Sequence, residues 1–230
     1  MSSDEWTTHK WISSCSWPER SELAEWNRAL PSRLVSTPVL GQHSVMRTAT
    51  QSDYVTVRDY LAAEAVSDIR HEYLGGLVYA MAGETRDHNQ IAQNFLFNLR
   101  QHLKGGPCKL YMSDIRVNFY LREDEYYYYP DIVVTCDKRD NDKLFIHYPK
   151  LIIEVLSPST ERLDKREKFF AYTSIASLEE YVLVSQTARE VTVFRRAHDW
   201  KAEKASGAKA KVALESLNVT LPLPVIYEGV

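Results

Sequence analysis

Apolar residues recur at helical spacing in two parts of the chain. A helix is predicted from Thr56-Val57-Arg58-Asp59, because a threonine followed three residues later by a carboxylate resembles a capping box. A longer helix is predicted from His88 to Lys104, and Gly105-Gly106-Pro107 predicts where it ends. Its apolar stripe consists of Ile91, Ala92, Phe95, Leu96, Leu99 and Leu103.

Short apolar runs bounded by turn residues predict strands. The segment 71–81 is predicted to be a hairpin, with Gly75-Gly76 as its turn. Ser157-Pro158-Ser159-Thr160 predicts the cap of a helix at about 162–174, and the Lys- and Ala-rich segment 201–211 predicts a solvated loop. Further strands are predicted at 109–120, 131–136, 151–156, 181–185, 190–195 and around 217–226.

This order of elements predicts an α/β (α+β) sandwich around one mixed sheet. Residues 1–50 differ from the rest, because they hold four of the five tryptophans and no sustained helical or strand period. Apart from a short helix at 21–30, we expect them to form a mobile or loosely docked N-terminal extension. The main domain is predicted to span residues 51–230.

Composition narrows the class of protein. A 44% hydrophobic and 26% charged content is ordinary for a globular protein. No stretch approaches the roughly 18 apolar residues of a membrane span, and the first residues lack a secretory signal, so a cytoplasmic location is expected. A net charge of −3 argues against avid, sequence-blind binding to duplex DNA, so any contact with nucleic acid is expected to be local.

The three cysteines, Cys15, Cys108 and Cys136, are an odd number without a CxxC pair. This pattern indicates neither a disulfide framework nor a cysteine-rich zinc site. Each cysteine is expected to act as a small buried hydrophobic residue.

Two carboxylates stand in segments that are otherwise built to be buried. Asp131 lies within Tyr129-Pro130-Asp131-Ile132-Val133-Val134, and Glu154 lies within Ile152-Ile153-Glu154-Val155-Leu156. An ionised carboxylate in an apolar strand is costly without a cation or several hydrogen-bond donors. The pair therefore favours a site for a hard metal ion such as Mg²⁺. Taken singly, Asp131 also fits a strand-start turn, and Glu154 fits a buried salt bridge.

Strand alternation limits the geometry of such a site. Ile152, Glu154 and Leu156 are predicted to share one face of their strand, and Asp131 is predicted to lie on the side of Val133. If the two strands are neighbours in suitable register, both carboxylates meet near one strand end.

Several separated motifs together resemble the Uma-type restriction endonucleases, a family within the PD-(D/E)XK nuclease superfamily. The resemblance covers about residues 50–230 and implies a restriction endonuclease-like core, with a central mixed sheet flanked by helices. The motifs that carry it are His71-Glu72-Tyr73-Leu74-Gly75-Gly76, Ala82-Gly83 with His88, Tyr129-Pro130-Asp131-Ile132, the segment 149–160, and Asp164 with Lys168 and Tyr172.

One departure concerns the lysine that the superfamily name places two residues after the second carboxylate. Leu156 occupies that position, and Lys168 is the residue that matches the lysine supplied by the following helix in the Uma-type branch. Asp164, Lys168 and Tyr172 are spaced i, i+4 and i+8, so they share one helix face. A helix packed on the strand could return Lys168 to Glu154.

The resemblance implies a Mg²⁺-dependent endonuclease, with Mn²⁺ as a substitute ion, that hydrolyses phosphodiester bonds, expected in DNA. Asp131, Glu154 and Lys168 are the implied catalytic residues, with Glu72 in support, and the implied metal ligands are Asp131, Glu154 and the backbone carbonyl of Val155. Glu72 fits a solvent-facing strand glutamate equally well. His88 fits either a helix cap or a site residue.

DNA is the expected partner, and a homodimer or higher homo-oligomer is expected because duplex cleavage requires two cuts. Two other functions stay open at this point. One is a catalytically inactive nucleic-acid-binding protein of the same fold, which Leu156 would favour. The other is a metal-dependent hydrolase acting on another phosphoester, because a fold does not by itself fix a function.

Overall fold

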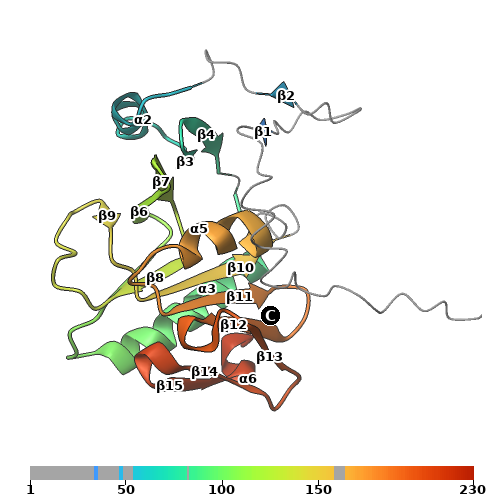
Figure 1. Ribbon diagram of the computed structural model, residues 1–230. Coiled ribbons are helices and arrows are strands. Elements are labelled where there is room, and N and C mark those ends of the chain that lie inside the picture. Colours follow the sequence, from blue (N-terminus) through green and yellow to red (C-terminus); the bar gives the residue numbers. More distant parts are fainter. Residues whose placement is uncertain (1–33, 36–46, 49–53, 82, 158–163) are drawn as a thin grey trace, which may run out of the picture. The chain divides into compact units, whose positions relative to one another are not determined.

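The computed structural model describes residues 34–35, 47–48, 54–81, 83–157 and 164–230 (Figure 1). The chain divides into two compact units, Met1–Ser52 and Asp53–Val230. In the first unit, β1 (Leu34–Val35) pairs antiparallel with β2 (Arg47–Thr48). The helix expected at 21–30 lies outside the described residues, and the mobile extension stays a prediction.

Six strands of the second unit form a mixed sheet. Its order is β13-β12-β11-β10-β8-β5, with β10 and β11 parallel and the other neighbours antiparallel. Every residue of β10 is buried, as expected for a central strand. The strands are β5 (Lys109–Met112), β8 (Ile132–Thr135), β10 (Leu151–Leu156), β11 (Glu180–Ser185), β12 (Glu190–Arg195) and β13 (Ala202–Ser206).

A second sheet of five strands, which the sequence did not predict, has the order β4-β3-β7-β6-β9. The predicted hairpin is confirmed as β3 and β4, and its turn residues Gly75 and Gly76 have φ values of 52° and 101°, which glycine adopts without a Cβ clash. The strands are β3 (His71–Leu74), β4 (Leu77–Ala80), β6 (Arg116–Leu121), β7 (Asp124–Tyr128) and β9 (Phe145–Ile146).

Two predictions about strands were wrong. The run 109–120 is not one strand, because the chain turns at Ser113, where φ is 53°, and places β5 in the first sheet and β6 in the second. The segment 201–211 is not a loop alone, because β13 pairs with β12 along its whole length. Lysine and glutamate are tolerated there because β13 is an edge strand.

The helices are α2 (Val57–Glu64), α3 (Arg86–Leu103), α5 (Phe169–Thr173) and α6 (Leu223–Ile226). The predicted helix start is confirmed, because the Thr56 hydroxyl caps α2 by accepting a hydrogen bond from Asp59 N at 3.2 Å and donates one to the Asp59 carboxylate at 2.7 Å. Thr85 caps α3, because its hydroxyl accepts a hydrogen bond from His88 N at 3.1 Å. No helix within the described ranges is long and apolar enough to cross a membrane.

The helix expected at 162–174 begins, in the described part, with a π-helical turn at Asp164–Lys168 and continues as α5. Its expected cap falls mostly in 158–163, outside the described residues. The strand expected around 217–226 is only β15 (Val219–Pro222), which pairs with β14 (Lys211–Leu214) and leads into α6. Short 3₁₀ turns cover Arg196–His198 and Glu215–Leu217.

The two faces of β10 belong to two different hydrophobic cores. Leu151, Ile153 and Val155 pack with α3, α6 and the β14-β15 pair, whereas Ile152 and Leu156 pack with α5 and the second sheet. Figure 1 shows α3 and α5 on opposite sides of β10 and β11. The predicted alternation along this strand is therefore confirmed.

Cys108 and Cys136 form a disulfide, so the prediction of unpaired cysteines is wrong for these two. The reason is the register of β5 against β8, in which Lys109 lies opposite Thr135. The next residues outward, Cys108 and Cys136, therefore face each other across the strand pair. Strand pairing is a tertiary property that a count of cysteines does not reveal.

Replacing Phe95 of α3 with alanine is expected to lower the free energy of unfolding by about 3–5 kcal/mol, because the ring is fully buried and its loss leaves a cavity. Phe97, on the same helix, is 63% exposed and supplies the control. Phe97→Ala is expected to change stability by less than about 0.5 kcal/mol. Urea unfolding measures both, and equal losses would contradict the described helix face.

Candidate active site

Asp131 and Glu154 meet where β8 and β10 lie side by side. Ile132 is opposite Ile153 in this antiparallel pair, so one step further along places Asp131 opposite Glu154. The Asp131 amide donates a hydrogen bond to Glu154 Oε2 at 3.2 Å, and the Val155 amide donates one to Asp131 Oδ2 at 2.7 Å. The register that the sequence left open therefore brings the two carboxylates together.

Lys168 reaches this point from the π-helical turn. Its Nζ lies 3.2 Å from Glu154 Oε1, 3.0 Å from Glu72 Oε1 and 3.5 Å from Asp164 Oδ1, and all four side chains are buried. One turn further on, the Tyr172 hydroxyl donates a hydrogen bond to Glu154 Oε1 at 3.2 Å. The shared helix face of Asp164, Lys168 and Tyr172 thus packs onto the Glu154 side of β10.

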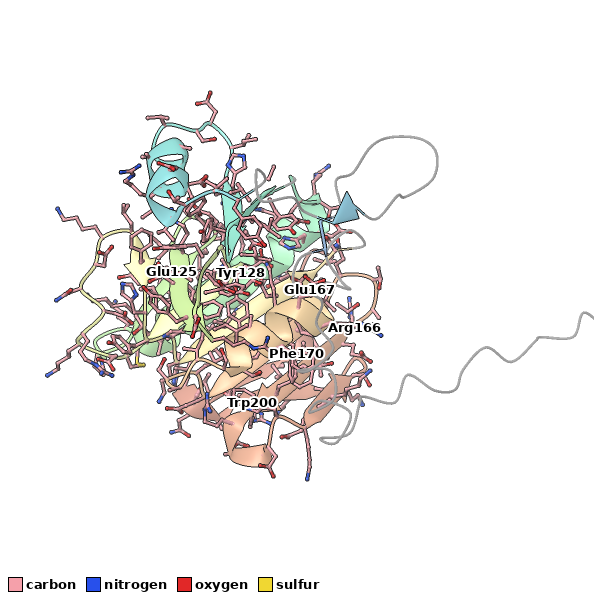
Figure 2. The ribbon with its side chains drawn as sticks, turned by 45° about the horizontal axis from the view of Figure 1, so that its top comes forward. Glu125, Tyr128, Arg166, Glu167, Phe170 and Trp200 are labelled. Carbon is pink, nitrogen blue, oxygen red and sulfur yellow. A yellow bond between two sulfur atoms is a disulfide. The ribbon has the colours of Figure 1, made fainter. Side chains whose placement is uncertain are left out.

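Glu72 comes from the second sheet. It is 5% exposed, so the solvent-facing interpretation of this glutamate is wrong, and Oε1 accepts a hydrogen bond from the Tyr129 amide at 3.2 Å. The Tyr128 ring lies between this sheet and α5, with its centre 5.5 Å from Lys168 Nζ (Figure 2). Arg166 and Glu167 are exposed on the outer side of the same turn (Figure 2).

The position of β3 is fixed by a further buried carboxylate, Glu64 of α2. It accepts hydrogen bonds from the His71 amide and from the Tyr129 hydroxyl, both at 2.9 Å. His71 precedes Glu72, and Tyr129 binds Glu72 through its amide. Glu64 therefore holds the two segments that orient Glu72, a role that no motif in the sequence indicates.

Burial and like charges together set the protonation behaviour of the cluster. Burial raises the pKa of Glu154 well above its ordinary value, and Asp131, Asp164 and Glu72 raise it further, although Lys168 opposes them. Burial also raises the pKa of Glu72. Burial by itself would lower the pKa of Lys168, but Glu154, Glu72 and Asp164 outweigh it and raise that pKa, so Lys168 stays protonated.

His88 lies on the other side of Asp131. Its Nε2 is 3.1 Å from Asp131 Oδ2 and 3.9 Å from Glu84 Oε2, and its side chain is buried. Burial would lower the His88 pKa, but the hydrogen bond and charge of Asp131, with Glu84 and the Val155 backbone, raise it. The sequence left His88 open as either a helix cap or a site residue. The cap of α3 is supplied by Thr85, and the His88 side chain instead contacts the carboxylate cluster. Glu84 was missed because it belongs to no motif.

The donor set fits a divalent cation on grounds of charge. Among the described residues, no three His, Cys, Asp or Glu side chains converge closely enough to hold a metal ion by themselves. Mg²⁺ does not need such a group, because it is usually bound by one or two carboxylates and completes its shell with water and phosphate oxygens. Three carboxylates, those of Glu72, Glu154 and Asp164, surround the ammonium group of Lys168, and Asp131 adjoins Glu154.

The family comparison agrees with this arrangement of motifs. A family model, Uma2, described as "Putative restriction endonuclease", matches residues 57–225. The chain belongs to the Uma2 family. The match begins at the first residue of α2, ends within α6, and includes every residue of the cluster.

Two relatives in Synechocystis sp. and one solved structure resemble this Uma2 chain. "Uncharacterized protein slr1290" is 36% identical over 74% of this chain and 90% of its own length. "Uncharacterized protein sll1609" is 27% identical over 76% of this chain and 100% of its own length. The structure, a "putative nuclease belonging to DUF820" from Anabaena variabilis, has a TM-score of 0.64 and 17% identity over 75% of this chain and 97% of that one, which shows a common fold.

Lys168→Met is expected to lower the free energy of unfolding by about 3–5 kcal/mol at about pH 8, because it leaves buried carboxylates without their cation. The pKa values of Glu72 and Glu154 are raised in the folded protein. The ordinary pKa of a glutamate is 4.5, and above this pH the folded state therefore binds more protons than the unfolded state. The free energy of unfolding consequently falls as the pH rises above 4.5.

The loss in Lys168→Met should accordingly shrink as the pH is lowered from about 8 to about 5. Urea unfolding at both pH values measures it. Lys143→Met, at an exposed lysine, is the control and should show almost no loss at either pH. If Lys168→Met lost the same free energy of unfolding at both pH values, the result would contradict an excess of buried carboxylates around Lys168.

Proposed function

We propose that this protein is a Mg²⁺-dependent endonuclease that hydrolyses phosphodiester bonds in DNA. The supporting observation is the convergence of Asp131, Glu154 and Lys168 at one point, from two strands and a helical turn that are separate in the sequence. The family description and the nuclease-named structural neighbour support the same class of reaction.

Asp131, Glu154 and the backbone carbonyl of Val155 would hold the metal ion in this proposal. When bound, such an ion polarises a phosphoryl oxygen and lowers the pKa of a coordinated water. Lys168, which remains protonated, stabilises the negative charge that develops on the phosphate. Glu72 positions Lys168 through the 3.0 Å ion pair, and His88 orients Asp131 through the 3.1 Å contact.

The catalytically inactive alternative rested on Leu156 at the expected lysine position. The contact between Lys168 and Glu154 weakens that argument, because an ammonium group is supplied from another element. The alternative hydrolase would turn over small phosphoesters without binding DNA. Cleavage assays separate both alternatives from the proposed function.

The proposal includes a homodimer or higher homo-oligomer, because two strands of a duplex must be cut. It also places the protein in the cytoplasm.

Added Mg²⁺ or Mn²⁺ is expected to raise the melting temperature of the wild-type protein, because an ion that binds only the folded state stabilises it by mass action. At about one hundred times the dissociation constant the gain is about 2.7 kcal/mol. Asp131→Asn should lose most of this shift, since it removes one proposed ligand. Differential scanning calorimetry with and without the ion measures the shift.

Glu123→Gln is the matched control for this change, because it alters an exposed acid in the turn between β6 and β7. It should retain the full metal-dependent shift. Loss of the shift in both variants, or in neither, would contradict a specific ion site at Asp131.

Purified protein is expected to cleave plasmid or single-stranded DNA in the presence of Mg²⁺ or Mn²⁺. Asp131→Asn and Lys168→Met should each reduce the cleavage rate by a factor of about 100 or more, because each removes a group that stabilises developing charge. Glu123→Gln should cleave like the wild type. Cleavage that survives both site substitutions would come from a contaminant and would refute the proposed active site.

A further inference from the structure

A groove of about 730 Å³ lies between the C-terminal turns of α3 and the strand β5, which forms one edge of the six-stranded sheet. Its wall includes Phe97, Arg100 and Lys104 from the helix side and Lys109 and Tyr111 from the strand. A groove of this size is in the range of about 300–1,000 Å³ that is typical of ligand sites.

This groove is separate from the carboxylate cluster. His88, which contacts Asp131, lies in the first turn of α3, whereas the groove begins at Phe97 and extends past the last turn. The 18-residue helix is about 27 Å long, at about 1.5 Å per residue. The two regions also lie at opposite ends of β8. Asp131 precedes the first residue of this strand, whereas the groove lies at its other end, near Cys136.

The sequence around the groove is free of acidic residues. The segment 88–113 contains no aspartate or glutamate, although the chain has 31 of them and a net charge of −3. Arg100, Lys104 and Lys109 are exposed within it and line the groove, whose wall holds no carboxylate. The groove is therefore a local cationic site on a mildly acidic protein, and its charge is complementary to a polyanion.

An exposed aromatic side chain, that of Phe97, lies among these cations. Phe97 is 63% exposed, although it lies on a helix whose neighbouring turns bury Phe95 and Leu99 completely. Tyr111 of the strand wall is half-buried and packs against the core on the opposite face of the sheet, so Phe97 is the aromatic ring that the groove exposes. Aromatic faces interleaved with basic residues bind unpaired bases by stacking while the cations bind the phosphates.

We propose that this groove binds single-stranded nucleic acid, as a second contact region remote from the catalytic cluster. The proposal rests on the proposed function in one respect, namely that the substrate is nucleic acid. A second copy of the chain is a poorer occupant, since a symmetric contact would bring the same three cations face to face. A duplex is a poorer occupant for the stacking contact, because its bases are already stacked and paired.

The test is fluorescence anisotropy with a labelled oligodeoxynucleotide of about 16 nucleotides, the upper site size of single-strand-binding modules, and with an RNA of the same sequence. The buffer contains EDTA, so that no cleavage occurs. Phe97→Ala is expected to weaken binding about 10-fold, within the range measured for loss of one base stack. The variant should fold normally because Phe97 is exposed.

The triple variant Arg100→Ala, Lys104→Ala, Lys109→Ala is expected to reduce the slope of log affinity against log salt by about 2, because three phosphate contacts at about 0.7 each are removed. Lys143, Lys201 and Lys209, which are exposed outside the groove, supply the charge-matched control triple. Tyr120→Ala, at a 66% exposed tyrosine, is the aromatic control.

Wild-type protein that binds neither oligonucleotide, or groove variants that bind as tightly as the wild type, would overturn the proposal. A polyglutamate peptide is the further probe. If it binds as tightly as the oligonucleotides and Phe97→Ala leaves oligonucleotide binding unchanged, the groove serves an acidic protein instead. Plasmid cleavage reports separately on the catalytic cluster, so groove-dependent binding without cleavage would refute only the proposed nuclease activity.

Discussion

The ion cluster around Lys168 joins three parts of the fold that are far apart in the sequence. Glu154 comes from the centre of the six-stranded sheet, Glu72 from the second sheet, and Asp164 from the same helical turn as Lys168. All are buried, so each charge depends on the others to remain in a region of low dielectric. The placement of the second sheet against α5 and the properties of the candidate site therefore depend on the same contacts.

The charges of the cluster are unbalanced, and this imbalance is what distinguishes it from a structural ion pair. The buried carboxylate of Glu180 differs, because it is paired with Arg195 and accepts hydrogen bonds from the backbone amides of Glu215 and Ser216. Around Lys168 the carboxylates outnumber the cation, and burial raises the pKa of Glu72 and Glu154. Strongly perturbed groups of this kind are characteristic of functional sites.

α3 connects the two regions that the proposals concern. Its buried stripe packs under the six-stranded sheet, its first turn places His88 beside Asp131, and its last turns form one wall of the cationic groove. Between these two ends, Phe95 and Leu99 are fully buried and anchor the helix to the sheet. The two proposals thus assign phosphate chemistry to one end of this helix and base contacts to the other.

The sequence by itself determined most of the local elements, the alternation of β10 and the family, because these depend on side-chain period, turn residues and short motifs. It also indicated that Lys168 could replace the lysine missing at Leu156. Only the tertiary structure decided that Asp131 faces Glu154, that Glu72 is buried, that His88 contacts Asp131 and that Cys108 meets Cys136. Each of these depends on strand register and on the packing of separate sheets, which are set by long-range contacts and leave no local pattern in the chain.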